Sequence, residues 1–305
     1  MEFRAPEPRS WAEVVTSLGV VLGTTRFVGG QPLPVVALPV APHLRAYATF
    51  GERLVEAEAA TRWGKSFVEI VGHAVTNLTE HPPELVREGR LLRIVAGDGA
   101  AAARLLVPGF VAAAQEEVDG RAIFAIPERG TCLVAGAIDP EEVALLFDAA
   151  LTTWHESDEP LSPVVYTKTD EGDAFEPLQL GEDHPSFLRA RRAEVLLLGS
   201  VYAEQRASLE GLADAPELAP FEVTSHDGLG VVTASVALEQ EPALLPASEL
   251  VLLRPASNAE PVIVRAASLA ESHLLVRVPD FDPPRYALVR FPSPGEIAAL
   301  VAAGA

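Results

Sequence analysis

The sequence predicts an α+β protein made of two mixed α/β units. In the first half, amphipathic helical patterns alternate with short strand patterns. The second half opens with a long helical segment followed by a series of strands, which favours a mainly antiparallel sheet packed against that helix. Between the halves, residues 156–183 carry nine acids against one base, a net charge of −8. We therefore expect domains at 1–157 and 184–305, joined by an acidic connector at 158–183.

Two helix starts in the first half carry strong signals. Ser66-Phe-Val-Glu69 is a capping box, and the apolar face that follows it continues to Leu78. Asp139-Pro-Glu-Glu142 combines a cap residue, a proline in the first turn and acids at the positive end of the helix dipole. The other elements expected here are strands at 89–95, 122–126, 131–135 and 163–166, and a helical stretch at 100–117 that Pro108-Gly109 should kink or split.

The second half is predicted to be one long helix, at 185–212, and a strand-rich remainder. No repeat of fixed period is found, which excludes solenoids and propellers. The elements expected after the long helix are strands at 221–224, 230–236, 249–254, 262–265, 274–278 and 286–290, and a final helix at 294–303.

The charge of the chain restricts its partners. Its 305 residues carry 43 acids against 23 bases, a formal net charge of −20. This balance excludes a general nucleic-acid binder, which needs a basic face, and it argues against attachment to anionic lipids. A hydrophobic share of 49% and a mean hydropathy of +0.21 are typical of a folded protein. We expect a protein partner, and the charge favours a basic one.

Composition also predicts a cytoplasmic location. The N-terminus lacks the basic start and continuous apolar core of a signal peptide. Two uncharged runs, 14–25 and 27–42, are unsuited to crossing a bilayer, because the first is short and the second contains prolines and glycines. Cys132 is the only cysteine, so it forms no intramolecular disulfide, and we expect a buried, inert thiol.

The sequence contains none of the familiar catalytic motifs: no G-x-S-x-G elbow, Walker A loop, H-E-x-x-H or paired C-x-x-C. A Gly-Asp-Gly turn before Arg104 resembles a phosphate loop, but Asp98 would repel phosphate, so an ordinary connection is favoured. His184 has acidic neighbours but no second histidine nearby, and the acids at 170–173 lack EF-hand spacing. We therefore expect no catalytic residue, no metal site and no cofactor.

The most unusual charge cluster is Arg189, Arg191 and Arg192, in the first turns of the long helix. Cations there oppose the helix dipole, at a cost of roughly 0.3 kcal/mol each. The acidic connector just upstream is the expected partner, which would form an internal charge clamp; an anionic ligand is the alternative.

Two pairs of polar residues share helix faces. His73 and Asn77 are four residues apart, so both could face one ligand; the alternative is a partly exposed helix pair. Tyr202 and Gln205 are three apart and could place a hydroxyl and an amide in a cleft between the halves. The structural alternative, which we favour, is that they bond backbone groups where the long helix packs on the sheet.

A series of short motifs follows in order along the chain: Trp63-Gly-Lys-Ser66, Ala74-Val-Thr-Asn-Leu78, Leu105-Leu-Val-Pro-Gly-Phe110, Leu161-Ser-Pro163, Tyr202-Ala-Glu-Gln205, Leu244-Leu-Pro-Ala-Ser-Glu-Leu-Val251 and Pro283-Pro-Arg-Tyr286. Their order and spacing resemble the YtpQ-like bacterial family, a family of unknown function, over most of the chain from about Ala46. Members tend to have Lys and Asp where this sequence has Ala247 and Glu249. The resemblance implies a cytoplasmic bacterial protein and no particular reaction.

The leading functional hypothesis is a non-enzymatic bacterial protein that binds another protein in a regulatory or accessory role. The first alternative is a sensor or enzyme for an anionic metabolite, with Tyr202, Gln205 and the arginine cluster in a cleft between the halves. The second is an immunity protein that blocks a basic toxin by charge complementarity.

Overall fold

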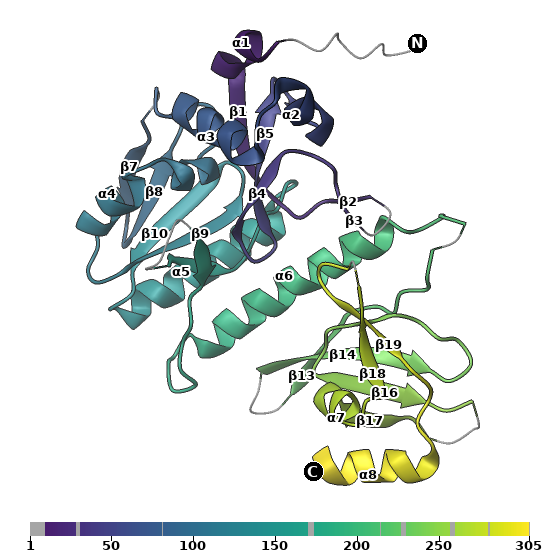
Figure 1. Cartoon of the computed structure of the whole chain (residues 1–305). Helices are drawn as coiled ribbons and strands as arrows, with labels where there is room; N and C mark the ends of the chain where they lie inside the picture. Colours follow the sequence, from purple (N-terminus) through teal and green to yellow (C-terminus); the bar gives the residue numbers. More distant parts are fainter. Residues whose placement is uncertain are drawn as a thin grey trace. The chain divides into compact units, whose positions relative to one another are not determined.

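The computed structural model has the predicted α+β class, with helices packed on several sheets (Figure 1). Its contacts divide the chain into two compact units. Unit 1 comprises Met1–Thr25 and Pro34–Glu194, and unit 2 comprises Arg26–Leu33 and Val195–Ala305. The structure describes residues 10–28, 31–80, 82–169, 174–213, 215–226, 230–256, 260–279 and 281–304.

The observed division between the units lies inside helix α6 (Phe187–Ala207), not at the expected connector. Segment 158–183 instead supplies two strands, β11 (Val165–Lys168) and β12 (Phe175–Pro177), to a sheet of unit 1. The strand expected at 163–166 corresponds to β11, whereas β12 was not predicted, because it is only three residues long and lies in an acidic stretch. The acids at 170–173 lie outside the described residues.

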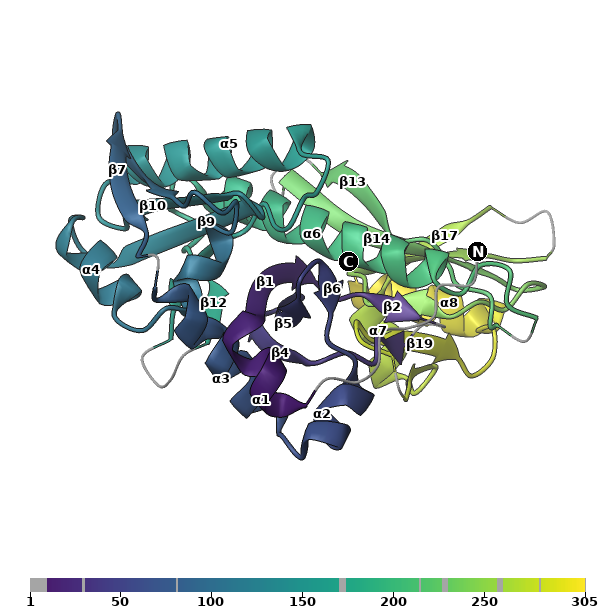
Figure 2. The same ribbon diagram turned by 90° about the horizontal axis from the view of Figure 1, so that it is seen from above.

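The larger sheet of unit 1 has six strands in the order β12-β11-β9-β10-β8-β7, and all its neighbours are antiparallel. All residues of β10 and all but the last of β9 are buried, as expected for central strands covered on both faces. Helix α5 (Pro140–Glu156) packs along β9 and β10 (Figures 1 and 2). The other strands are β7 (Glu84–Glu88), β8 (Leu91–Val95), β9 (Ala122–Glu128) and β10 (Thr131–Gly136).

A smaller sheet of unit 1 lies in the part of the chain for which no elements were predicted. Strand β5 pairs antiparallel with β1, β4 and β6, and helix α3 packs on β1 and β5. The uncharged run 14–25 gave no alternating pattern because β1 is buried or half-buried at every position. The elements are α1 (Trp11–Val14), η1 (Val15–Ser17), β1 (Leu18–Thr24), β4 (Ala37–Ala41), β5 (Leu44–Phe50), β6 (Arg53–Leu54) and α2 (Ala57–Trp63).

The predicted helix boundaries in unit 1 are confirmed. Helix α3 (Phe67–Leu78) begins after Ser66, whose side chain accepts a hydrogen bond from the backbone N–H of Glu69. Asp139 caps α5 in the same way, by accepting from the N–H of Glu141 at 2.8 Å. The helical stretch at 100–117 is split into a short 3₁₀ helix, η2 (Ala102–Leu106), and α4 (Phe110–Glu116), as proline and glycine between them require.

Unit 2 contains a four-stranded sheet, β13-β14-β16-β17, and a three-stranded sheet, β15-β19-β18. The predicted antiparallel arrangement holds except between β14 and β16, which run parallel. A two-stranded ribbon, β2-β3, also belongs to this unit. The elements are β2 (Phe27–Val28), β3 (Gln31–Pro32), β13 (Glu222–His226), β14 (Gly230–Leu238), β15 (Leu245–Pro246), β16 (Leu250–Arg254), β17 (Val262–Arg265), α7 (Ala266–Glu271), β18 (Leu275–Val278), β19 (Arg285–Leu288) and α8 (Pro294–Gly304).

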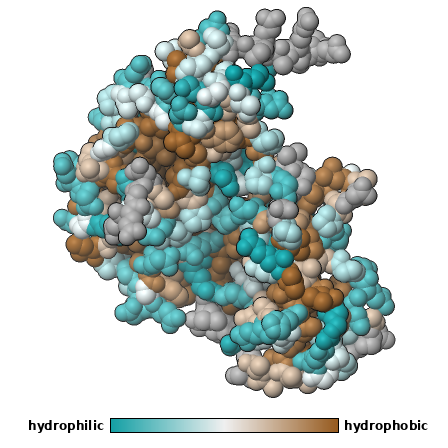
Figure 3. Space-filling model, in the orientation of Figure 1, coloured by the Kyte–Doolittle hydropathy of each residue, from teal (hydrophilic) through white to brown (hydrophobic). Residues whose placement is uncertain are grey.

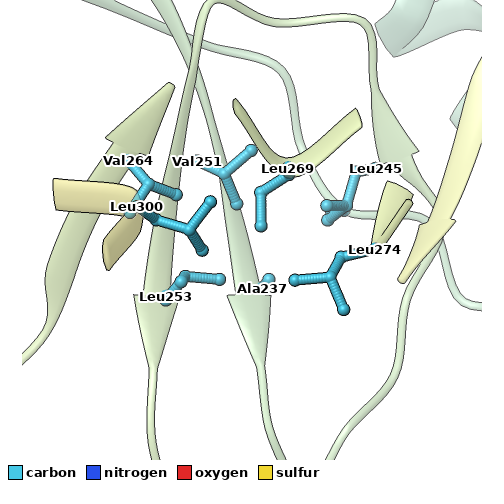
Figure 4. Close-up of a cluster of buried hydrophobic side chains, with 9 residues drawn as sticks. Ala237, Leu245, Val251, Leu253, Val264, Leu269, Leu274 and Leu300 are labelled. Atoms are coloured by element: carbon cyan, nitrogen blue, oxygen red, sulfur yellow. The ribbon is translucent and has the colours of Figure 1, made fainter. Parts of the chain in front are cut away.

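The core of unit 2 forms where both sheets meet the two C-terminal helices. Leu269 of α7 and Leu300 of α8 point into a cluster of side chains from β14, β16 and β17 (Figure 4). The N-terminal half of α6 is rich in arginine, and no helix in the described part of the chain is both long and apolar enough to cross a membrane.

The cap of α3 gives a test of local stability in unit 1. All three tryptophans lie in this unit, so tryptophan fluorescence during urea unfolding reports on it. Ser66→Ala removes the acceptor for the Glu69 N–H, and we expect the free energy of unfolding to fall by about 1 kcal/mol. The control Ser225→Ala removes an exposed hydroxyl from a strand of unit 2 and should change this transition by less than about 0.5 kcal/mol. Equal effects of the two substitutions would contradict the capping role.

Candidate functional site

Asn77 and His73 make separate contacts in the structure. The Asn77 side-chain amide donates hydrogen bonds to the carbonyls of Val15 and Leu18, each at 2.9 Å. His73 is exposed, and its ring meets the edge of Trp11 with centroids 5.3 Å apart. Asn77 therefore attaches α3 to η1 and to the start of β1, because its amide donates to one backbone carbonyl in each.

The Gly-Asp-Gly turn is not a phosphate loop. Arg104 is buried, and its Nη2 atom lies 2.5 Å from a carboxylate oxygen of Asp98. Its Nη1 atom donates to the carbonyl of Leu78 at 3.0 Å. Asp98 also accepts from the N–H of Ala100. The arginine that could have bound an anion is thus used to connect the turn to the end of α3.

One arginine of the α6 cluster is neutralised within unit 1 by an acid of helix α5. Arg189 Nε lies 2.9 Å from a carboxylate oxygen of Asp148 on α5. Glu159, an acid of the predicted connector, pairs instead with Arg129 at 3.3 Å. Arg191 is half-buried and Arg192 exposed, so the three arginines do not converge on one buried site.

Tyr202 and Gln205 are buried in unit 2 and bond its backbone. The Tyr202 hydroxyl donates to the carbonyl of Pro284 at 2.8 Å and accepts from the N–H of Ala247 at 2.9 Å. Gln205 Nε2 donates to the carbonyl of Pro283 at 3.0 Å. Burial raises the pKa of Tyr202 to about 12. The favoured structural interpretation of this pair agrees with the geometry, and neither side chain is open to a ligand.

Arg285 was quoted only as part of the motif Pro283-Pro-Arg-Tyr286, yet it is the centre of these contacts. Its side chain is fully buried and donates from Nε to Gln205 Oε1 at 2.7 Å and from Nη1 to the Ala219 carbonyl at 2.8 Å. The guanidinium carbon lies 4.7 Å from the centre of the Tyr202 ring, within cation–π range. Burial lowers the pKa of Arg285 to about 10, so the group is still cationic at neutral pH. We call Tyr202, Gln205 and Arg285 the arginine network.

Three of the motifs quoted from the sequence meet at the arginine network. Tyr202 and Gln205 come from the first, Ala247 from the second and Arg285 from the third. Their spacing along the chain therefore follows a structural requirement of unit 2. A buried arginine is hard to find in a sequence, because exposed arginines have the same composition around them; its position beside two prolines was the only available signal.

Several hollows lie on the described surface of unit 2, and three of them bear on function. One, of about 210 Å³, is lined by small residues of α7 and by Ser248, whose hydroxyl bonds Ser235 and the Leu250 carbonyl. A second, of about 230 Å³, is lined by both Arg206 and Glu210. The third, of about 350 Å³, we call the β19 groove. Its lining residues are Pro216, Glu217, Ala237, Leu238, Glu239, Pro242, Ala243, Leu244, Ala287, Leu288, Val289, Arg290 and Phe291.

The chemical inventory of the described residues offers little for catalysis. Within them, no group of three or more His, Cys, Asp or Glu side chains is placed to hold a metal ion. Cys132 is fully buried in β10, and burial raises the pKa of its thiol well above the ordinary range. That environment agrees with the predicted inert thiol, since the thiolate is the reactive form.

Comparisons with models of protein families, with curated proteins and with solved structures found no match.

Arg285 gives a sharp test of the arginine network. Arg285→Met leaves the oxygens of Gln205 and Ala219 buried without their donor, and we expect unit 2 to lose at least about 2 kcal/mol of stability. Hydrogen exchange of the β14 and β16 amides measures this unit directly. Arg277→Met, an exposed position on β18, is the matched control and should change exchange little. Unchanged protection in Arg285→Met would show that the network is not needed for stability.

Asn77 gives the corresponding test in unit 1. Asn77→Ala leaves the Val15 and Leu18 carbonyls without their donor, so the tryptophan-monitored unfolding free energy should fall by about 1–3 kcal/mol. Thr76→Ala is the control, because Thr76 is exposed and bonds only along its own helix, to the Gly72 carbonyl. If Asn77→Ala behaved like Thr76→Ala, the two long-range hydrogen bonds would carry no net stability.

Proposed function

We propose that this is a non-enzymatic bacterial protein that binds another protein in a regulatory or accessory role. The observation that carries the proposal is that the polar side chains most suggestive of a ligand site already have partners within the fold. Tyr202 and Gln205 are hydrogen-bonded to the backbone of unit 2, and Arg189 is paired with Asp148. The residues expected to bind a small molecule thus stabilise the fold instead. The proposal therefore places the function on the protein surface.

The charge supports a partner of opposite sign. A formal net charge of −20 steers basic proteins toward the chain and repels acidic ones. The resemblance to the YtpQ-like family, proposed from the quoted motifs, agrees with an accessory role in a bacterium, since it implies no reaction.

The direct test is recovery of a specific partner from native bacterial lysate with the tagged chain as bait. We expect a basic protein to be retained at about 0.1 M salt and to be released as the Debye length falls from about 10 Å toward about 3 Å at 1 M. An unrelated acidic protein of similar net charge, used as a parallel bait, removes partners that follow charge alone. Recovery of the same proteins by both baits would overturn the proposal.

A thermal-shift screen with nucleotides and phosphorylated metabolites tests the rival function. A ligand present at a hundred times its dissociation constant adds about 2.7 kcal/mol to stability, which is easily detected. We expect no such stabilisation. A clear shift by one metabolite would favour a small-ligand sensor or enzyme instead.

A further inference from the structure

We infer that the β19 groove of unit 2 is the docking site for a segment of a partner protein that carries an apolar side chain flanked by lysine or arginine. This inference rests on the proposed protein-binding function and names the surface and the chemistry of the partner.

The floor of the groove is apolar and belongs to the core of unit 2. Ala237 is one of the buried core residues, and Ala243, Leu288 and Phe291 pack against that core from the groove side. A volume of about 350 Å³ lies at the lower end of the range for small-molecule pockets, about 300–1,000 Å³. A hollow of this size suits one or two side chains of a protein segment.

Apolar surface continues from the groove onto the neighbouring strand. Val289 lines the groove and is 63% exposed, and Val276 on β18 is 50% exposed. Val276 lies opposite Ala287, another lining residue, in the β18–β19 register. Figure 3 shows hydrophobic colour on the surface of unit 2 in the region of these strands. Together these residues form an apolar surface that is exposed in the described part of the chain.

Charge selects a basic occupant. Glu217 and Glu239 are exposed at the groove, and among the described residues neither forms an ion pair. The cation at the groove, Arg290, is already neutralised by Glu296 through two bonds of 2.8 and 2.5 Å. Glu239 accepts a hydrogen bond from the N–H of Ala256 at 2.6 Å, but neither carboxylate is paired with a cation among the described residues. The groove therefore presents two acidic groups beside an apolar floor, and this arrangement complements a cationic segment with an apolar anchor.

The test is fluorescence anisotropy with labelled peptides of about seven residues, roughly 23 Å when extended. The probe alternates Lys or Arg with Leu or Phe. One comparison peptide replaces the bases with Glu and Asp, and the other keeps the bases but replaces the apolar residues with Ser. We expect the probe to bind the wild-type chain and both comparison peptides to bind at least about tenfold more weakly.

Variants locate the binding site. Val289→Arg places a positive charge in the groove, which repels the basic probe, and should weaken probe binding by about tenfold or more. Ile263→Arg is the matched control: it makes the same substitution at a position that is 61% exposed on β17 and outside the groove lining, and it should bind as the wild type does. Val289→Ser serves as a second variant in case Val289→Arg does not fold. It removes only the apolar contact and should weaken probe binding by an intermediate factor.

The outcomes separate this inference from the proposed function. The groove assignment is overturned if the probe does not bind, if the acidic peptide binds equally well, or if the Val289 variants bind like Ile263→Arg. A partner recovered from lysate that binds Val289→Arg and wild type equally would leave the protein-binding function standing and refute this surface. If the lysate experiment recovered no specific partner but the probe still bound in the groove, the proposed function would be refuted and the groove assignment would stand.

Discussion

A guanidinium buried without a carboxylate must be solvated by neutral oxygens and an aromatic ring, and Arg285 of unit 2 meets this requirement with groups from distant parts of the chain. Gln205 and Tyr202 come from α6, and the Ala219 carbonyl from the segment before β13. Taking the charge out of water costs several kcal/mol, about as much as a whole set of hydrogen bonds returns. The segments are therefore useful to one another only when all are in place, so the network favours cooperative assembly of unit 2.

The proposed binding surface depends on the same network. Leu244 lines the β19 groove, and its carbonyl lies 3.4 Å from Arg285 Nη1. Ala287 and Leu288 follow Arg285 directly in β19 and also line the groove. A substitution of Arg285 would thus alter the walls of the groove without changing its surface residues. Network stability and groove binding can be separated only by substitutions on the exposed side, such as those at Val289.

Local signals in the sequence identified elements whose boundaries depend on neighbouring residues. The caps at Ser66 and Asp139, the break at Pro108-Gly109 and the strands β9 and β10 are examples. The sheet containing β1 escaped prediction because β1 and β5 are buried or half-buried at every position, so their sequences lack a regular apolar–polar alternation. The role of Arg285 escaped for a different reason: its partners lie 80 and 66 residues away, and only the folded chain brings them together. Tyr202 and Gln205 could be found from their helical spacing, but their partners could not.

The burial of Cys132 has a practical consequence for spectroscopy. The only thiol of the chain is fully buried in β10 and its pKa is raised, so electrophilic thiol reagents will not modify it in the folded protein. The natural chain is in effect a cysteine-free background. A cysteine introduced at an exposed position of each unit would accept a fluorophore or spin label cleanly, so the distance between the units and its distribution in solution could be measured without removing any native residue.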